Sequence, residues 1–371
     1  MQQTPLIAQH RAVGAKLVDF AGWEMPIQYS GVVDEYQTVR STAGIFDVSH
    51  MGRILVDGPG SAAFLQRLTT NDVAKLAVGQ AQYSMVCNEQ GGIEDDIFVY
   101  RTGETEFLLC VNASNRTKIL KRITAAHISA DTCRIKDRSS ALAQLAVQGP
   151  ASRAILLDLG LEQVGALKIH HTCEITLLGI SCFVARTGYT GELGYELNVP
   201  AEQAGMLWER IIKAGGAHGL KPAGLGARDL LRLEMAYLLY GNDIDEQTTP
   251  LDAGVEWTVN FQKGPFVGSQ ALAEQQRVGV QRRLVAFELL EKGVPRHGCR
   301  IVDASSCQPI GEVTSGNLSP RLQKGIGLGY VPLSYATAGT SIAIDIRGRI
   351  MPASVVKPPF YKKPVRREGK G

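Results

Sequence analysis

A short segment, Asn88–Tyr100, ends in a run that places three acidic residues (Glu94–Asp96) beside two aromatic ones and could carry proton-transfer chemistry. Its first five residues, Asn88–Gly92, are turn formers, and the residues that follow favour a β-strand even though strands disfavour aspartate. Because successive side chains of a strand point to opposite faces, every second residue shares a face. One face is predicted to carry Glu94, Asp96, Phe98 and Tyr100. The other is predicted to carry Ile93, Asp95, Ile97 and Val99.

The carboxyl group of Asp96 is expected to lie beside Phe98 and Tyr100 on the first of these faces. Aromatic neighbours remove water from a carboxyl group, which raises its proton affinity. An aromatic wall with one carboxylate would suit a flat, nitrogen-rich ligand, and Tyr83, on the preceding predicted strand, could flank it. A solvated hairpin end with outward-pointing acids would give the same pattern, so the pattern alone leaves both interpretations open.

Two further segments carry candidate binding residues. Arg186–Glu196 is a glycine-rich hairpin loop with one aromatic and one acidic side chain of interest, Tyr189 and Glu196, although most such loops are only turns. Arg228 is predicted in the first turn of a helix, where a cation opposes the helix dipole and often has an acidic partner or a ligand. The neighbouring Asp229 is better explained as a favourable first-turn acid.

The composition excludes several classes of protein. With 371 residues, 44% of them hydrophobic and 20% charged, the chain can form two or three globular domains and is not a disordered chain. Its net charge of +3 is too small for a dedicated nucleic-acid binder. The segment Lys357–Gly371 holds six basic residues and one acid, which fits either a solvated, frayed terminus or an electrostatic dock for an acidic partner.

The sequence also gives expectations about compartment and cofactors. No run of about 18 apolar residues is present and Met1–His10 lacks signal-peptide features, so neither a membrane span nor a secretory signal is expected. The seven cysteines, an odd number without a C-x-x-C pair, fit a reducing cytoplasm and argue against a zinc cluster or a disulfide framework. P-loop, G-x-S-x-G, H-E-x-x-H and complete dinucleotide-binding motifs are absent, so no metal, flavin or nicotinamide cofactor is expected.

Helical and strand patterns alternate through the first three quarters of the chain and indicate α+β subdomains. Helices are predicted over 61–68, capped by Ser61, and over 116–126, 152–159, 203–214 and 227–239. Strands are predicted over 80–87, 93–100 and 107–111, from Leu142 onward, and over 173–178, 181–187 and 195–199.

The character of the sequence changes near residue 276. Gln275–Arg283 is polar and basic, which favours a linker. Short strands with frequent turn signals follow, and this pattern indicates a small all-β barrel or sandwich. Those strands are predicted over 284–289, 300–302, 309–314, 326–331 and 341–346.

Segments spread in order over nearly the whole chain resemble the T-protein family of the glycine cleavage system, whose members are aminomethyltransferases. The matching segments are Phe20–Tyr29, Ala43–Gly52, Leu68–Val73, Gly79–Tyr83, Gly91–Asp96, Arg186–Glu196, Leu225–Glu234, Tyr240–Ile244 and Thr249–Gly254. The resemblance implies two interlocked α+β subdomains that bind tetrahydrofolate, followed by a C-terminal β-barrel. The predicted linker agrees with that division, which gives domains of 1–276 and 284–371.

The resemblance also implies a reaction. The family takes an aminomethyl group from the lipoyl arm of H protein and yields ammonia, the dihydrolipoyl carrier and 5,10-methylenetetrahydrofolate, with P and L proteins as indirect partners. The methylene carbon bridges two folate nitrogens that must both lose protons, so a carboxylate near the arylamine nitrogen is chemically apt. No nucleic acid, membrane, metal, flavin or nicotinamide is expected to take part, and the expected compartment is the cytoplasm.

Individual roles are carried over by position from the family. Asp96 matches the catalytic aspartate, which accepts a proton or stabilises the cationic intermediate. Glu196 matches a carboxylate that holds the pterin amine edge, and Arg228 matches a folate-site arginine. The aromatics around the folate are matched by Tyr83, Tyr100, Tyr189 and Tyr237. Asp95, on the opposite strand face from Asp96, is then expected to be structural.

Three other functions compete with this interpretation. A non-catalytic folate-binding relative would carry a Lys-Gly-Cys-Tyr-type motif, and the matching stretch Lys263–Gly268 has no cysteine. A folate-dependent demethylase would act on a free substrate without a lipoyl partner, and the length of the chain does not exclude it. A basic RNA-binding module would rest on the basic tail alone, since no aromatic platform for single strands accompanies it.

Overall fold

A computed structural model of the chain describes residues 1–128, 131–177 and 179–363. Leu178, predicted to end a strand, and the tail residues Arg366, Arg367, Glu368 and Lys370 lie outside the described residues. The chain folds into two compact units. The first unit is formed by residues 1–229 and 244–279, and the second by residues 230–243 and 280–371.

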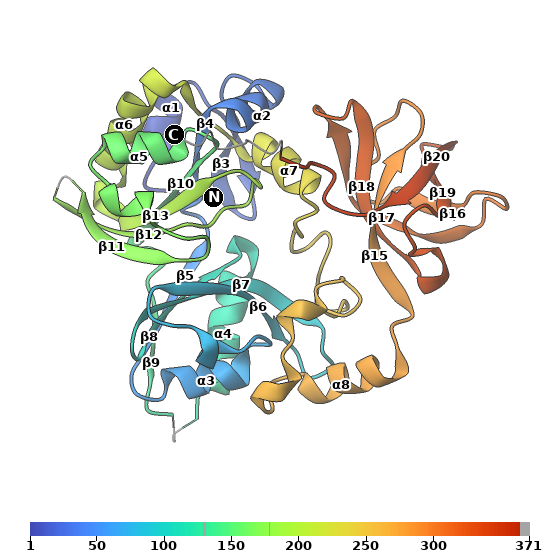
Figure 1. Ribbon diagram of the computed structural model, residues 1–371, viewed down its shortest axis with the longest axis horizontal. Coiled ribbons are helices and arrows are strands. Elements are labelled where there is room, and N and C mark those ends of the chain that lie inside the picture. The colour runs from blue at the N-terminus through green and yellow to red at the C-terminus, as the bar shows by residue number, and fades with distance from the viewer. Residues whose placement is uncertain (129–130, 178, 364–371) are drawn as a thin grey trace, which may run out of the picture. The chain divides into compact units, whose positions relative to one another are not determined.

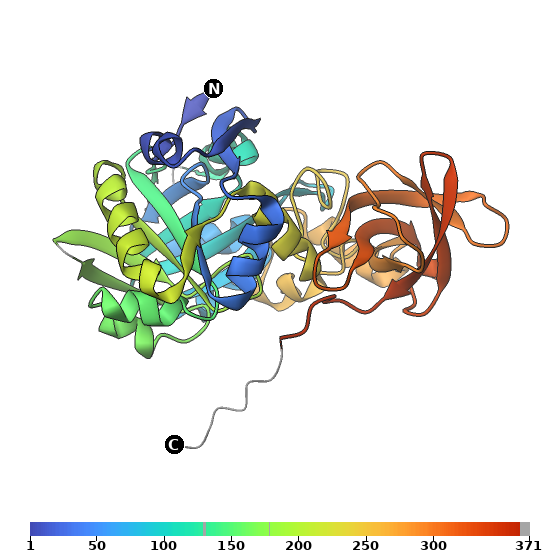
Figure 2. The ribbon, with the colours of Figure 1, turned by 90° about the horizontal axis from the view of Figure 1, so that it is seen from above.

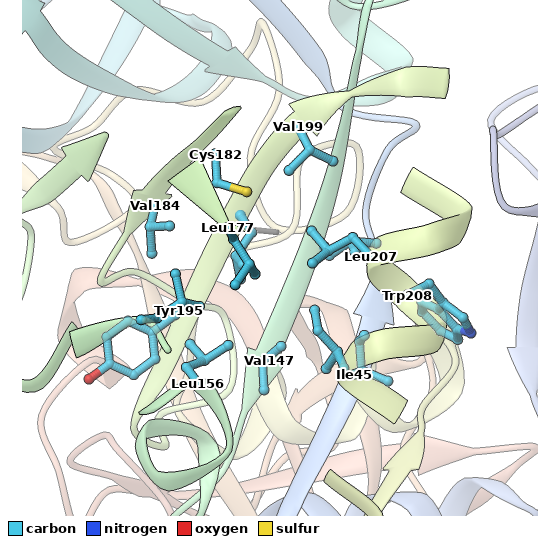
Figure 3. Close-up of a cluster of buried hydrophobic side chains, with 14 of the residues drawn as sticks. Ile45, Val147, Leu156, Leu177, Cys182, Val184, Tyr195, Val199, Leu207 and Trp208 are labelled. Atoms are coloured by element: carbon cyan, nitrogen blue, oxygen red, sulfur yellow. The ribbon is translucent and has the colours of Figure 1, made fainter. Parts of the chain in front are cut away.

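A six-stranded sheet with two helices beside it forms one part of the first unit (Figure 1). The strand order is β11-β12-β13-β10-β4-β14, antiparallel throughout except for the parallel pair of β14 and β4. The elements are β4 Ala43–Asp47, β10 Leu142–Gln148, β11 Thr172–Leu177, β12 Ile180–Ala185, β13 Gly194–Pro200, β14 Leu220–Pro222, α5 Ser152–Asp158 and α6 Ala204–Gly215. Figure 3 shows their core, where Val147 and Tyr195 of the sheet belong to one cluster with Leu156 of α5 and Trp208 of α6.

A five-stranded antiparallel sheet, ordered β6-β7-β8-β5-β9, forms the second part of this unit. Its elements are β5 Gly52–Asp57, β6 Gln80–Cys87, β7 Ile93–Gly103, β8 Glu106–Val111, β9 Arg134–Asp137, α3 Ser61–Leu68 and α4 Arg116–Ala126. The two helices cover one face, where Phe64 of α3 and Ile119 of α4 share a buried cluster with Ile97 and Val99 of β7 (Figure 1). The opposite face of β7 carries Asp96, and at the start of that face Glu94 pairs with Arg122 of α4 at 3.1 Å.

A three-stranded sheet, ordered β1-β3-β2, and several helices complete the first unit. The elements are β1 Gln2–Gln3, α1 Ile7–Ala12, β2 Lys16–Phe20, β3 Trp23–Gln28, α2 Val32–Ser41, α8 Ser269–Val278 and the start of α7 Leu225–Glu234. Short 3-10 helices occupy some connections, and two of them bear on the site described below. They are η2 Ala113–Asn115 and η6 Glu256–Thr258.

The second unit is built on a closed barrel of six strands, coloured orange to red in Figure 2. The strands are β15 Arg282–Leu289, β16 Arg300–Asp303, β17 Pro309–Ser319, β18 Lys324–Pro332, β19 Ser341–Ile346 and β20 Arg349–Val356. They close in the order β15-β18-β17-β16-β19-β20. The last half of α7 belongs to this unit, since Leu233 shares a buried cluster with Ala286, Leu328 and Phe360.

The predicted fold class, α+β followed by a C-terminal β-barrel, is confirmed. Several boundaries differ. The helix predicted over 227–239 ends at Glu234, because Ala236 adopts a left-handed backbone with φ 55°. The segment predicted as a linker is mostly ordered structure, since α8 runs to Val278 and β15 begins at Arg282. Strand β20 was absent from the prediction.

Ser61 does not cap its helix as predicted. It lies inside α3, which has Gly60 at its N-cap position. Its hydroxyl donates a hydrogen bond of 2.8 Å to the carbonyl oxygen of Thr105, in the turn between β7 and β8. The side chain therefore joins the helix to the sheet instead of satisfying the first turn of the helix.

Candidate active site

Asp96 and Tyr83 lie together on the antiparallel pair of β6 and β7. Tyr83 lies opposite Phe98 in the strand register, and its hydroxyl donates a hydrogen bond of 2.7 Å to Oδ2 of Asp96. Asp96 and Phe98 are half-buried, whereas Asp95 and Ile97 are buried. This alternation agrees with the predicted strand faces and places the carboxyl group of Asp96 on the aromatic face of β7.

Asn112, which the sequence-based prediction missed, also holds the carboxyl group of Asp96. Its Nδ2 donates to Oδ1 of Asp96 at 2.7 Å and lies 3.1 Å from the carbonyl oxygen of Asp96. The ladder of β7 and β8 pairs Phe98 with Cys110, and its continuation by two residues places Asn112 opposite Asp96. Pairing the two predicted strands in this register would have identified it.

Burial and the charge of Asp96 shift the pKa values of its titratable neighbours. Burial and the nearby charge of Asp96 raise the pKa of Tyr83 well above its usual value, so its hydroxyl remains a hydrogen-bond donor. Burial and the same charge raise the pKa of the fully buried Asp95 to about 7. The amide of Asn115 donates to Oδ1 of Asp95 at 2.6 Å and partly offsets the cost of that burial.

Aromatic side chains form a continuous row beside this carboxyl group. The ring of Phe98 lies 5.6 Å from that of Tyr83 and stacks on Tyr100 at 5.9 Å, measured between centroids. The row continues at one end to Trp257 of η6, 5.9 Å from Tyr83, and at the other to Phe183, 5.6 Å from Tyr100. Neither Trp257 nor Phe183 was predicted from the sequence. Such a row offers ring faces and edges to a flat ligand.

Glu196 lies near the Tyr100 end of the aromatic row. It is on β13 and only 8% exposed, and the hydroxyl of Thr187 donates to its Oε2 at 2.5 Å. Burial and the charge of Glu196 raise the pKa of Tyr100 well above its usual value. A buried carboxylate with one neutral donor can still accept hydrogen bonds from a ligand that carries N–H groups.

Arg228 and Tyr189 meet next to Glu196. The guanidinium carbon of Arg228 lies 4.7 Å from the centre of the Tyr189 ring, within the range of a cation–π contact. Burial lowers the pKa of Arg228, and the charge of Glu196 opposes this effect. Within the described ranges, Nη1 of Arg228 is buried without a hydrogen-bond partner. This nitrogen is therefore available to a ligand acceptor.

The glycine-rich loop that carries Tyr189 closes around the side chain of Gln148. The hydroxyl of Thr190 donates to Oε1 of Gln148 at 2.9 Å, and Nε2 of Gln148 donates to the carbonyl oxygen of Thr187 at 3.2 Å. A Cβ atom at Gly188 or Gly194 would come within 2.0 Å or 2.3 Å of Gln148. The two glycines thus allow the loop backbone to approach the Gln148 side chain closely, and this contact orders the loop.

Tyr237 belongs to the barrel unit, whereas the other predicted site residues belong to the first unit. Its ring is 37% exposed, and its carbonyl oxygen accepts a hydrogen bond of 3.1 Å from Nη1 of Arg232. Arg232 in turn forms a buried ion pair of 2.7 Å with Asp243. The role of Tyr237 beside a folate stays a prediction.

The described residues hold no group of three or more His, Cys, Asp and Glu side chains arranged for a metal ion. No helix in that part of the chain combines the length and the apolar character that a membrane span needs. All seven cysteines carry free thiols.

Comparison with known proteins places both units in one family. Residues 6–263 match the GCVT N-terminal domain, and residues 282–362 match the glycine cleavage T-protein C-terminal barrel domain. The aminomethyltransferase of Halothermothrix orenii is 47% identical over 97% of this chain and 100% of its own length, and that of Desulforamulus reducens is 43% identical over 98% and 99%. The crystal structure of glycine cleavage system aminomethyltransferase T from Bartonella henselae matches with a TM-score of 0.91 and 35% identity, over 97% of this chain and 98% of that one. The chain therefore belongs to the glycine cleavage T-protein family.

Proposed function

We propose that the chain is the aminomethyltransferase of a glycine cleavage system. It transfers the methylene carbon from the aminomethyl-lipoyl arm of H protein to tetrahydrofolate and produces ammonia, 5,10-methylenetetrahydrofolate and dihydrolipoyl H protein. The observation that carries the proposal is the match over nearly the whole chain to proteins named aminomethyltransferases. P and L proteins are indirect partners, because they act on the same H protein.

Asp96 is the proposed catalytic residue. Two N–H protons must leave the folate nitrogens when the methylene carbon bridges them; one ends on the departing ammonia and the other on the lipoyl sulfur. A half-buried carboxylate can accept such a proton or stabilise the positive charge that precedes its loss. The geometry supports this role, since the neutral donors Tyr83 and Asn112 fix both carboxylate oxygens without neutralising their charge.

Glu196 and Arg228 are proposed to bind the folate ring system, with Tyr83, Tyr100, Tyr189 and Tyr237 as its aromatic surroundings. Glu196 accepts hydrogen bonds from the amine edge of the pterin. The buried, unpaired Nη1 of Arg228 supports a donor role toward a ligand oxygen or nitrogen. Tetrahydrofolate is the co-substrate, and no metal, flavin or nicotinamide takes part.

Replacing Glu196 with glutamine is expected to weaken tetrahydrofolate binding. Glutamine keeps an oxygen for the Thr187 hydroxyl but removes the negative charge that faces the pterin. The dissociation constant should rise about 10- to 100-fold, the usual worth of a hydrogen bond to a charged group. Calorimetry measures it, with Glu202→Gln, an exposed acid of the same unit, as the matched control. Equal affinities for the two variants would contradict the role of Glu196.

Ammonia release from aminomethylated H protein tests the function itself. The enzyme is expected to release ammonia rapidly only when both the loaded H protein and tetrahydrofolate are present. Release from a free N-methyl substrate without H protein would instead identify a folate-dependent demethylase. Folate binding without turnover of either substrate would identify a non-catalytic folate-binding relative.

Three further proposals concern the domain boundaries, the chemistry of the partner and the compartment. The domains divide into a folate-binding part, 1–276, and a barrel part, 284–371. Segment 280–371 holds fifteen basic and six acidic residues, which supports an acidic protein partner and does not require nucleic acid or a membrane. The cytoplasm is the proposed compartment, supported by the seven free thiols.

A further inference from the structure

The amide group of Asn112 joins two carboxyl groups that lie on opposite faces of β7. Its Nδ2 lies 2.8 Å from Oδ1 of Asp95 and 2.7 Å from Oδ1 of Asp96. The backbone N–H of Asn112 also donates to Oδ2 of Asp95 at 3.0 Å. An amide nitrogen carries only two hydrogens, and here both carboxyl groups draw on them. A change in position or charge of one carboxyl group therefore affects the other.

Asp95 is a buried acid whose hydrogen-bond donors, within the described residues, are all neutral. It is 0% exposed, and the donors that the described chain supplies to it are the two N–H groups of Asn112 and the amide of Asn115. All three are neutral, so they stabilise the carboxylate less than an arginine would. Because burial and the charge of Asp96 raise the pKa of Asp95 to about 7, this residue exchanges a proton near neutral pH.

The other titratable groups that face the two aspartates keep their protons in this range. Tyr83 of β6 has a pKa raised well above its usual value by burial and by Asp96. Burial raises the pKa of Cys110 of β8 to about 12, and the charge of Asp95 contributes to this shift. The side chains of Asn112 and Asn115, between β8 and α4, do not titrate. Among these groups, Asp95 is therefore the one whose pKa lies near 7.

We infer that Asp95 and Asn112 are positioning residues for Asp96, and that the three side chains act as one coupled unit. Asn112 orients the Asp96 carboxylate toward the aromatic face, and the charge of Asp95 behind the strand increases the basicity of Asp96. This inference rests on the proposed catalytic role of Asp96. It changes the role expected for Asp95, which is more than a structural residue.

The pH dependence of turnover separates this coupling from a merely structural role. Asp95 becomes charged only as the pH rises through about 7, where its charge increases the basicity of Asp96, so the wild-type profile should bend there and Asp95→Asn should remove that bend. Asn112→Ala removes a donor to the charged form of Asp96, so the acid limb moves up. Asn115→Ala removes a side-chain donor to Asp95, favours its protonated form and should move the bend to higher pH. A structural role would lower turnover without moving the acid limb or the bend, and that result would overturn the inference.

A second readout does not depend on activity. Folding raises the pKa of Asp95 from about 4 to about 7, so the folded state takes up a proton between these values and its stability falls as pH rises through them. The free energy of unfolding of the wild type should therefore decrease from pH 5 to pH 7 relative to Asp95→Asn. If Asp95→Asn does not fold, Asn115→Ala provides the comparison: its Asp95 keeps the proton longer, so the decrease in the free energy of unfolding should continue to higher pH than in the wild type.

Different results would overturn the coupling of Asp95 and Asn112 to Asp96 and the catalytic role of Asp96. A flat stability difference, together with an unchanged pH profile of turnover in the variants and an inactive Asp96→Asn, would overturn the coupling and leave the proposed function standing. Full turnover of Asp96→Asn would overturn the catalytic role of Asp96, even if the stability difference changes with pH as expected.

Discussion

Asp96→Asn is expected to lose about 10²–10⁴ in turnover, the usual contribution of a positioned acid–base group, while its affinity for tetrahydrofolate changes much less. Asparagine has the shape of aspartate without its charge. Its oxygen can accept from Asn112, and its amide can donate to the Tyr83 hydroxyl, which can also accept a hydrogen bond. The side chain should therefore remain in place and the fold should persist. Single-turnover transfer from loaded H protein and calorimetry with tetrahydrofolate measure the two quantities.

Asp57→Asn is the matched control for this loss. Asp57 lies on β5 of the same sheet and pairs with the exposed Arg134 at 2.5 Å, far along the chain from the site residues of β6 and β7. Its turnover should equal that of the wild type, and thermal melting of both variants should confirm folding. A folded Asp96→Asn enzyme with wild-type turnover would exclude a proton-accepting role for this carboxylate.

Asp243→Ala should lower the free energy of unfolding of the barrel unit by about 3–5 kcal/mol, because it leaves a buried arginine without its counter-charge. The side chains of Arg232 and Asp243 are 3% and 0% exposed. The carboxylate also accepts from the backbone N–H of Leu239 at 2.9 Å and from the hydroxyl of Thr314 at 2.6 Å. Alanine would also remove the acceptor of the Leu239 N–H and of the Thr314 hydroxyl.

Chemical denaturation measures this loss, and Glu288→Ala is its control. Glu288 pairs with Lys324 at 3.0 Å on the exterior of the same unit, and the lysine is 51% exposed. Such a pair is worth about 0–1 kcal/mol, so the control should unfold close to the wild-type midpoint. Similar midpoints for the two variants would mean that the Arg232 charge is stabilised by other groups.

The face assignment along β7 was predictable from the sequence because strand periodicity is local. Asp96 and Phe98 alternate with Asp95 and Ile97 in the chain, and a regular strand must separate them. Asn112 was not found, since its position depends on the register between β7 and β8. Trp257 could not be predicted at all. It lies on a short 3-10 helix more than 150 residues after Tyr83 in the chain, and no local sequence pattern indicates that the two rings come together.

Helix boundaries were predicted less well than strand faces. The apolar pattern after Arg228 continues to Leu239, yet the helix ends at Glu234 because Ala236 takes a left-handed conformation. Alanine favours helices, so its residue type predicted the opposite. The buried contacts of Arg232 with Asp243 and with Ser315 lie around this turn, and tertiary packing of that kind overrides local preference.

The path of α7 limits how this protein can be rearranged as a modular assembly. The chain enters the barrel unit within α7, leaves it at Asp243, and returns only at residue 280. A fragment that begins between α8 and β15 would therefore not contain the whole barrel unit. The isolated downstream product would lack residues 230–243, and the shortened upstream product would retain Arg232 without the Ser315 hydroxyl that accepts its hydrogen bond. Exchange of barrels between relatives thus needs two junctions, and recombination at one boundary should yield unstable chimeras.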